Sequence, residues 1–217
     1  GEVRQAHLFL AVLGFSNYTF ARAYPDERTE SFLDAHVAAF AHLGGVPELI
    51  VPDNLKAGVK KPDRYEAEIA APYAEMAAHY ACVVMPARVG RPRDKAKVEV
   101  GVQIAEREIL APLRHRTFFS LAEMNAAIAE RLTAVNTRPF TKLPGSRASV
   151  FAGREAPLLR PLPAEPYACR TRKLATVHID YHVELEGHYY SVPYRFVRER
   201  VELRFDERTV EVYHEGV

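Results

Sequence analysis

The sequence predicts an α/β protein, in which a mixed sheet with helices is followed by a small antiparallel β-barrel. The first residues follow the order strand, strand, helix, strand, which is typical of a mixed sheet with helical cover. Short segments of alternating polarity dominate the C-terminal end. Prolines recur between these two parts without sustained periodicity. We therefore expect an α/β core over 1–137, a proline-rich linker over 138–173 and a barrel, truncated at its end, over 174–217.

The first elements are an expected hairpin and a helix. Residues 5–14 are apolar enough for a strand buried on both faces, and residues 17–24 alternate aromatic and small side chains as a neighbouring strand. Residues 14–17 supply the turn. A helix follows, for which Thr29 or Ser31 is the expected N-cap and Gly44 with Gly45 the expected end.

Two short buried strands and three helices complete the expected core. The strands are residues 48–51, which Pro52 stops, and residues 82–85. A short helix at 72–80 precedes the second strand. A longer helix begins at Asp94, a suitable N-cap, and ends near Pro112. Another runs from 120 to about 137, because Ser120 and Glu123 have the spacing of a capping box.

The expected barrel has four strands. Residues 175–185 alternate for eleven residues, residues 186–187 form a hairpin turn, and strands follow at 188–192, 200–205 and 209–214. In a single extended strand, His178 and His182 would lie about 13 Å apart, at about 3.3 Å per residue. That separation is too large for one metal ion, so we expect no metal site there.

Composition and charge narrow the function classes. The chain has 217 residues, 48% hydrophobic and 26% charged, which is ordinary soluble composition. No apolar run is long enough to span a membrane, and two distant cysteines argue against a zinc site or a disulfide framework, so a reducing cytoplasm is expected. The net charge is +1, yet residues 53–160 hold 18 Lys and Arg against 12 Asp and Glu. A basic stripe of this kind suits phosphate contact, although solvated helix faces are the commoner explanation.

Two carboxylates are the candidate catalytic groups. Asp53 stands at the carboxyl end of the strand that Pro52 stops, where chemistry gathers in open α/β sheets. Glu99 lies one turn inside the helix from Asp94, and we expect it to point inward. The candidate DNA contacts are basic residues of the preceding loop and helix start, with two residues after Asp53: Arg88, Arg91, Arg93, Lys95, Lys97, Asn54 and Lys56. The ordinary alternatives are a turn-forming Asp and a solvated Glu.

The sequence resembles a known family in six motifs, which together cover nearly the whole chain. These are Val51-Pro-Asp-Asn-Leu-Lys56, Tyr73-Ala-Glu-Met-Ala-Ala-His-Tyr80, Pro92-Arg-Asp-Lys-Ala-Lys-Val-Glu99, Arg116-Thr-Phe-Phe-Ser-Leu-Ala-Glu123, Asn136-Thr-Arg-Pro-Phe140 and Gly187-His-Tyr-Tyr-Ser-Val-Pro-Tyr194. They resemble the DDE polynucleotidyl transferases with a ribonuclease-H-like core, and among them the IstA-type insertion-sequence transposases, which are similar also in carrying a small β-barrel after the core.

The resemblance implies a function and a set of partners. Asp53 and Glu99 would be the second and third metal-binding acids, holding two Mg²⁺ or Mn²⁺ ions. The reaction would be cleavage at transposon DNA ends, followed by attack of the freed 3′-hydroxyl on target DNA. The family works as a homo-oligomer on DNA with a AAA+ ATPase helper. The first acid belongs to a strand expected before residue 1, so the chain alone should be inactive.

Three aspartates do not supply the missing acid in this interpretation. Asp26 falls in a turn, Asp34 on a helix and Asp63 in a surface segment, so none has a central-strand position. Two other functions stay open at this point. One is a non-catalytic DNA-binding or assembly module left from a truncated transposase. The other is a nuclease of ribonuclease-H type, which shares the fold and the metals.

Overall fold

The structure is a computed structural model that describes residues 2–52, 59–61, 68–85, 99–205 and 209–216. The chain divides into two compact units, Gly1–Tyr167 and Ala168–Val217. The first unit includes residues 138–167, which hold α6 (Arg147–Val150), the π-helical turn η2 (Phe151–Glu155) and the 3₁₀ turn η3 (Ala156–Leu158). The functional division into 1–137, 138–173 and 174–217 stays a prediction.

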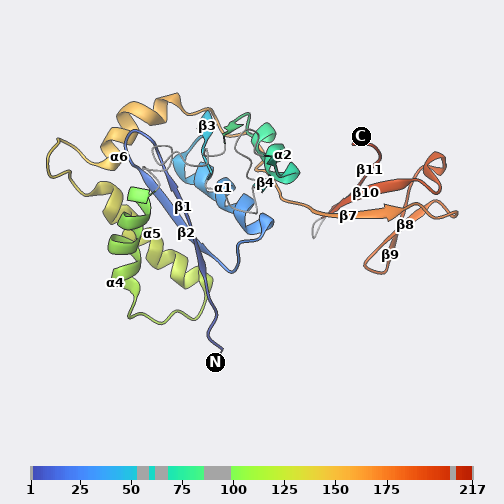
Figure 1. Ribbon diagram of the computed structural model, residues 1–217, viewed down its shortest axis with the longest axis horizontal. Coiled ribbons are helices and arrows are strands. Elements are labelled where there is room, and N and C mark those ends of the chain that lie inside the picture. The colour runs from blue at the N-terminus through green and yellow to red at the C-terminus, as the bar shows by residue number, and fades with distance from the viewer. Residues whose placement is uncertain (1, 53–58, 62–67, 86–98, 206–208, 217) are drawn as a thin grey trace. The chain divides into compact units, whose positions relative to one another are not determined.

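The first unit is built around the hairpin of β1 (His7–Val12) and β2 (Thr19–Tyr24). The strands are antiparallel, with His7 opposite Tyr24 and Val12 opposite Thr19. Figure 1 shows the hairpin between α1 (Thr29–Leu43) and α5 (Leu121–Thr137). Both faces are therefore covered, as the apolar run predicts. All six residues of β1 are nevertheless only half-buried, so the expectation of a fully buried strand is wrong.

The two faces of the hairpin have different cores. One face packs against α5, the π-helical η1 (Ala105–Leu110) and α4 (Ala111–Leu113), in a cluster of small and aliphatic side chains: Leu8, Leu10, Ala21, Ala23, Ala105, Ile109, Leu113, Ala127, Ile128, Leu132 and Val135. The other face is aromatic, because Phe9 contacts Phe20, Phe32 and His36 edge-on. The alternation along each strand sends successive side chains to these two cores.

The ends of the helices test the capping expectations. Ser120 caps α5 by accepting a hydrogen bond from the Glu123 amide, 3.1 Å away, as predicted. Gly44 ends α1 in the left-handed conformation, with φ of 70°. The N-cap of α1 is Arg28, without a side-chain cap, so neither Thr29 nor Ser31 caps it. Ser31 instead donates to Asp26, which turns the chain into the helix.

A second, smaller sheet lies in the same unit. β3 (Leu49–Ile50) pairs in parallel with β6 (Val83–Val84), and α2 (Ala71–His79) precedes β6. β4 (Val59–Lys61) and β5 (Glu68–Ile69), which come between β3 and α2 in the sequence, form a separate antiparallel pair. Leu49 and Val83 are 45% and 58% exposed. The expectation that both short strands are buried is therefore wrong for the described residues, since neither strand has a neighbour on its other side.

The described residues of the second unit form five strands and not the four expected. β7 (Thr171–Thr176), β10 (Arg200–Phe205) and β11 (Val210–Tyr213) form one sheet, in the order β11-β10-β7. β8 (His182–Leu185) and β9 (His188–Ser191) form a hairpin whose turn is at residues 186–187, as predicted. A 3₁₀ turn, η4 (Tyr194–Phe196), leads into β10. All these strand pairs are antiparallel.

The extra strand arises from a turn that the sequence pattern concealed. Residues 178–181 reverse the chain, because the His178 amide donates to the His182 carbonyl at 2.8 Å and Tyr181 takes a φ of 68°. His178 and His182 therefore both lie near Asp180, at 3.7 and 3.8 Å. The distance argument against a shared metal is wrong, although no group of three metal-ligating side chains exists in the described ranges.

Candidate active site

The strand pair β3–β6 directs two candidate segments to one edge. Ile50 lies opposite Val84, and the Met85 amide donates to the Ile50 carbonyl at 2.8 Å. Because the strands are parallel, the chain leaves both of them at the same carboxyl edge. Pro52, which is buried, leads from β3 to residue 53, and Met85 leads from β6 to the basic segment. This is the edge at which open α/β sheets bind their ligands.

Most of the predicted site residues lie outside the described residues. They are Asp53, Asn54, Lys56, Arg88, Arg91, Arg93, Lys95 and Lys97. Their mutual placement, including the approach of Asp53 to Glu99, stays a prediction. The residues on either side of them, however, fix where these segments begin and end.

Glu99 is the one predicted site residue that the structure describes. It is exposed, at the beginning of the helical residues 99–104 that continue into η1. Val102, Gln103 and Glu106, which share its face, are exposed too. The expectation of an inward-pointing carboxylate is therefore wrong for the described residues, because the face that carries Glu99 is the one directed away from the core. An exposed carboxylate remains accessible to metal and to DNA.

Gly101 sets the position of this helix against the hairpin. It is buried, and it starts a stripe at four-residue spacing that continues through Ala105 and Ile109 into the core. A Cβ atom at position 101 would lie 2.5 Å from Val12 Cγ2. Only glycine permits this approach. The close contact holds the Glu99 helix at the end of β1, at the Val12 end of the strand.

Two asparagines of α5 close the outer edge of the hairpin. The side-chain amide of Asn136 accepts from the Thr19 amide at 3.0 Å and donates to the Thr19 carbonyl at 2.8 Å. Asn125 makes the same pair of bonds to Ala23, at 2.7 and 3.0 Å. Each side chain thus replaces a residue of a neighbouring strand. Asn136 belongs to a motif noted in the sequence, but the motif gave no sign of this role.

Two aspartates, Asp26 just before α1 and Asp34 within it, make structural hydrogen bonds. Asp26 accepts from Ser31 at 2.7 Å and from the Arg28 amide, and the Ser31 bond is the first cause that lowers the pKa of Asp26. Asp34 accepts from the Tyr24 hydroxyl at 2.9 Å. The exclusion of Asp26 and Asp34 as metal-binding acids stays a prediction. Asp63 lies outside the described residues.

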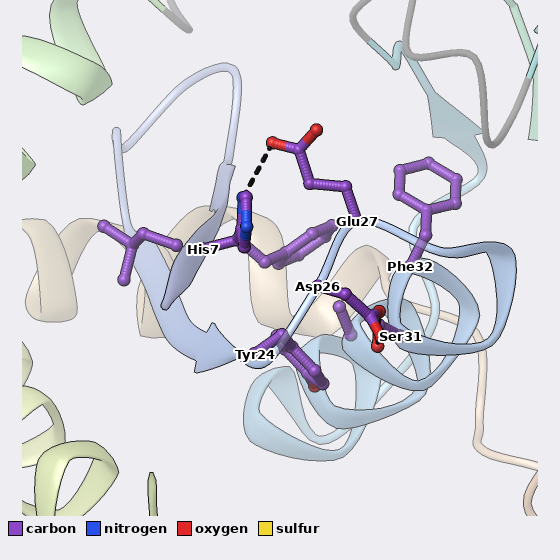
Figure 2. A pocket seen from close by; sticks show the side chains of 9 residues that line it. His7, Tyr24, Asp26, Glu27, Ser31 and Phe32 are labelled. Carbon is purple, nitrogen blue, oxygen red and sulfur yellow. Dashed lines mark hydrogen bonds and ion pairs between the residues drawn. The ribbon is translucent and has the colours of Figure 1, made fainter. Parts of the chain in front are cut away.

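A small cavity adjoins these residues. It has a volume of about 70 Å³ and lies between the beginning of β1 and the beginning of α1, lined among others by Phe9 and Phe32. Figure 2 shows its rim, where His7 Nδ1 lies 3.1 Å from Glu27 Oε1. Its lining is mostly apolar, and its volume is small. We assign it no chemistry.

The comparisons with known proteins decide the family. Residues 1–92 match the integrase core domain, and residues 162–217 match the C-terminal domain of Mu transposase. A protein assigned as the transposase of insertion sequence IS408 from Burkholderia multivorans is 49% identical over 98% of this chain, and one assigned to IS1162 from Pseudomonas fluorescens is 48% identical over 99%. This chain belongs to the insertion-sequence transposases with an integrase core. The prediction of that family is confirmed.

The relatives are longer than this chain. It spans 41% of the IS408 protein and 38% of the IS1162 protein. The transposase of insertion sequence IS21 from Pseudomonas aeruginosa is 26% identical over 94% of this transposase chain, which covers 52% of that relative. Activity, substrates and partners of a whole transposase are therefore matters of proposal for this chain.

Solved structures confirm the fold class. A chain of the simian T-cell lymphotropic virus intasome superimposes with a TM-score of 0.56 at 16% identity, over 96% of this chain and 70% of that one. The catalytic core domain of BIV integrase superimposes with a TM-score of 0.55 at 12% identity, over 70% of this chain and 90% of that domain. The first unit thus has the ribonuclease-H-like fold that was predicted. In the described part of the transposase chain, no helix is long and apolar enough to span a membrane.

Proposed function

We propose that this chain is the part of a transposase that positions two of its metal-binding acids, Asp53 and Glu99, for the cleavage and joining of DNA. The relation to insertion-sequence transposases over 98% of the chain is the observation that carries the proposal. The common carboxyl edge of β3 and β6 supports it, because residues 53 and 86 follow that edge directly. The Gly101 contact supports it as well, because it fixes the helix that begins near Glu99.

The donor chemistry fits magnesium or manganese. Both ions prefer oxygen ligands, and Mg²⁺ takes few protein groups. Glu99 offers an exposed carboxylate, and Asp53 would offer another. When bound, two such ions would stabilise the attacking and leaving oxygens of an in-line displacement. The HTLV-2 integrase catalytic core, with a TM-score of 0.51, was solved in complex with magnesium. The role of this chain is to hold the carboxylates and to present basic residues to the phosphates.

We propose that a further strand, preceding residue 1 in the whole protein, completes the site. The hairpin β1–β2 and the pair β3–β6 are separate two-stranded sheets among the described residues. α5 occupies the outer edge of β2, which leaves the other edge of β1 for a partner. Two-stranded sheets are marginal by themselves. A strand placed there would carry the first acid, and the chain alone would be inactive.

The partners of the whole protein follow from the same proposal. DNA would be bound at transposon ends and at the target, by a homo-oligomer in the cytoplasm, with a AAA+ ATPase selecting the target. The neighbouring structure of an intasome agrees with assembly on DNA.

The test is strand transfer on a pre-cut transposon-end duplex. We expect no product from the 217-residue chain and product from a version extended upstream through the proposed strand. Asp53→Asn and Glu99→Gln should each abolish the extended protein's activity. Glu106→Gln is the matched control, because Glu106 is also exposed, on the same helical face two turns later. Cleavage without joining would favour the nuclease, and DNA binding without metal-dependent chemistry would favour the non-catalytic module.

A further inference from the structure

A cavity of about 200 Å³ lies in the first unit between η1, the end of α5 and the segment that leads into α6. Its lining includes Ile104, Val135 and Phe140 as apolar groups. Three charged side chains line it as well, namely Glu108, Arg138 and Arg147. Neither the relatives' names nor the proposed chemistry of Asp53 and Glu99 assigns a role to it. Its walls come from residues that are separated in the sequence, so the cavity is a product of the fold.

The charges of the cavity do not balance. Arg138 Nη2 lies 2.8 Å from Glu108 Oε2, and this hydrogen bond is the first cause that lowers the pKa of Glu108, which keeps it ionised. Arg147 has no ion pair with any carboxylate in the described part of the chain. The lining thus has two guanidinium groups and one carboxylate, and the carboxylate pairs with Arg138. The cavity keeps a net positive charge.

One hydrogen bond and one aromatic ring position the guanidinium of Arg147. Its Nη1 donates to the Val135 carbonyl at 3.1 Å, and its guanidinium carbon lies 5.9 Å from the centre of the Phe140 ring. Its Nε atom is buried and has no hydrogen-bond partner among the residues that the structure describes. A buried donor without a partner is uncommon and calls for an explanation, such as a ligand or ion. Burial and the charge of Arg138 both lower the pKa of Arg147, in that order.

The segment around Arg147 is ordered before any ligand binds. Ser146 and Ser149 form a reciprocal capping box at the beginning of α6. The Phe140 amide donates to the Gly145 carbonyl at 2.9 Å, and Gly145 takes a φ of 89°, which favours glycine. These bonds close the loop that carries Phe140 and fix the start of the helix that carries Arg147. A preorganised arginine loses less freedom on binding an anion.

We propose that this cavity binds a backbone phosphate of DNA, with Arg147 as the principal contact and Arg138 beside it. Guanidinium groups match the geometry of phosphate oxygens and bind them in a forked arrangement. The proposal rests on the proposed function for the identity of the ligand, and it adds a binding subsite outside the acidic residues. Arg138, Pro139 and Phe140, which belong to the motif at residues 136–140, would then form one wall of this subsite.

The cavity lies beside the same helical segment that carries Glu99. Glu108 follows Glu99 by nine residues along one continuous helical segment, about 13 Å at about 1.5 Å per residue. On one strand of B-DNA, successive phosphates rise by about 3.4 Å along the axis. The rise along the helix is comparable to a few phosphates along a strand, but nine residues turn a helix by about 900°, so Glu108 and Glu99 lie on opposite sides of the segment. A phosphate in the cavity would therefore contact the protein on another side of this helical segment than Glu99.

Binding of the full 217-residue chain to a short fluorescent duplex, measured by anisotropy in EDTA at several salt concentrations, tests the proposal. We expect Arg147→Gln to weaken binding about tenfold and to reduce the salt slope by about one. The affinity of Arg147→Lys should lie between those of the unaltered chain and Arg147→Gln, because lysine keeps the charge and loses the forked geometry of the guanidinium. Arg154→Gln, an exposed arginine of the following η2, is the charge-matched control and should change the slope less. Equal effects of Arg147→Gln and Arg154→Gln would overturn the proposal.

A second experiment keeps the proposal testable if Arg147→Gln does not fold. Neutral methylphosphonates are placed one at a time along the duplex and bound to the unaltered chain. We expect one position to weaken binding, and Arg147→Lys to lessen that loss. No sensitive position would overturn the proposal. If, in addition, inorganic phosphate alone stabilised the chain against unfolding, the ligand of the cavity would be a free anion and not DNA.

The two proposals fail in different ways. Binding in EDTA does not depend on metal, so loss of strand transfer in the extended protein with an intact methylphosphonate effect would contradict only the catalytic proposal. An unchanged salt slope in Arg147→Gln with normal strand transfer would contradict only the phosphate subsite.

Discussion

The hydroxyl of Tyr73 lies 3.0 Å from Nε2 of His36, in a buried contact that joins α2 to α1. Nδ1 of His36 lies 2.8 Å from the Phe32 carbonyl, which only accepts, so Nδ1 carries the proton. Nε2 is then the acceptor, and Tyr73 donates. Of the two neutral tautomers only this one satisfies both contacts, and burial lowers the pKa of His36 to about 4, which favours the neutral form.

The stability of the first unit should therefore fall as the medium is acidified. The pKa of a histidine in the unfolded chain is about 6.5. As the pH falls, His36 therefore takes up a proton in the unfolded chain before it does so in the folded chain. The contribution of neutral His36 is full above pH 6.5 and is lost progressively toward pH 4. We expect about 2 kcal/mol less stability at pH 5.0 than at pH 7.5, measured by hydrogen exchange of α1 amides after correction for intrinsic rates. His36→Gln should flatten the dependence, and His188→Gln, at an exposed position, should leave it unchanged.

Removing the Tyr73 hydroxyl tests the contact itself. Tyr73→Phe leaves His36 Nε2 buried without a donor, which should lower the free energy of unfolding by about 1 to 3 kcal/mol at pH 7.5. Urea unfolding is the measurement. A change below a few tenths of a kcal/mol would show that water reaches Nε2 in place of the hydroxyl.

Asn136 should matter more than Asn125, although each makes two hydrogen bonds to β2. Asn136 is 3% exposed, whereas the bonds of Asn125 are only partly buried. We expect Asn136→Ala to destabilise by about 2 to 4 kcal/mol and Asn125→Ala by less, because water can replace the lost partner only where it has access. The free energies of unfolding of both variants, measured in urea, test this difference. Equal losses would contradict the assignment of burial as the cause.

Gly101→Ala should displace the helix that follows Glu99. The new Cβ would meet Val12 Cγ2 at 2.5 Å, and overpacking of this kind usually destabilises by about 1 to 3 kcal/mol. Val12→Ala removes the opposing atom, so the double variant should recover part of the loss, as a double-mutant cycle of urea unfolding would show. In the extended protein, strand transfer should fall with Gly101→Ala and rise again in the double variant. Additive losses would refute the contact.

Charge reversal at Arg91, Arg93 and Lys97 should weaken DNA binding and flatten its salt dependence. Each lost phosphate contact removes released counterion, whereas sequence preference should barely change, because phosphate contacts position the protein and base contacts specify. Anisotropy at several salt concentrations is the measurement. An unchanged slope would assign these residues to a solvated loop.

Local patterns were enough for several elements. The hairpin of β1 and β2, the extent of α5 with its Ser120 cap, and the turn at residues 186–187 follow from periodicity and from a few turn or cap residues. These features depend on neighbours close in the sequence, so the sequence contains their signal directly. The motifs likewise indicated the family, which the relatives confirmed.

Other features had no local signal. The alternating residues 175–185 predict one strand, but a turn at residues 178–181 interrupts it. The backbone hydrogen bond from the His178 amide to the His182 carbonyl closes this turn. The exposure of Glu99 was missed because helical spacing shows which residues share a face and not which face meets the core. Gly101 decides that orientation through its contact with Val12, 89 positions earlier in the chain.

By itself, the sequence determined the family, the α/β class and most element boundaries in the core, and it predicted acidic and basic site residues whose roles stay a prediction. Only the tertiary structure decided that Asn136 closes the edge of β2 at Thr19, across a sequence separation of 117 residues. The same holds for the cavity that joins Arg138 and Arg147 to Glu108. The physical reason is that these contacts arise from the packing of elements, and the residue types alone do not specify which partners packing will bring together.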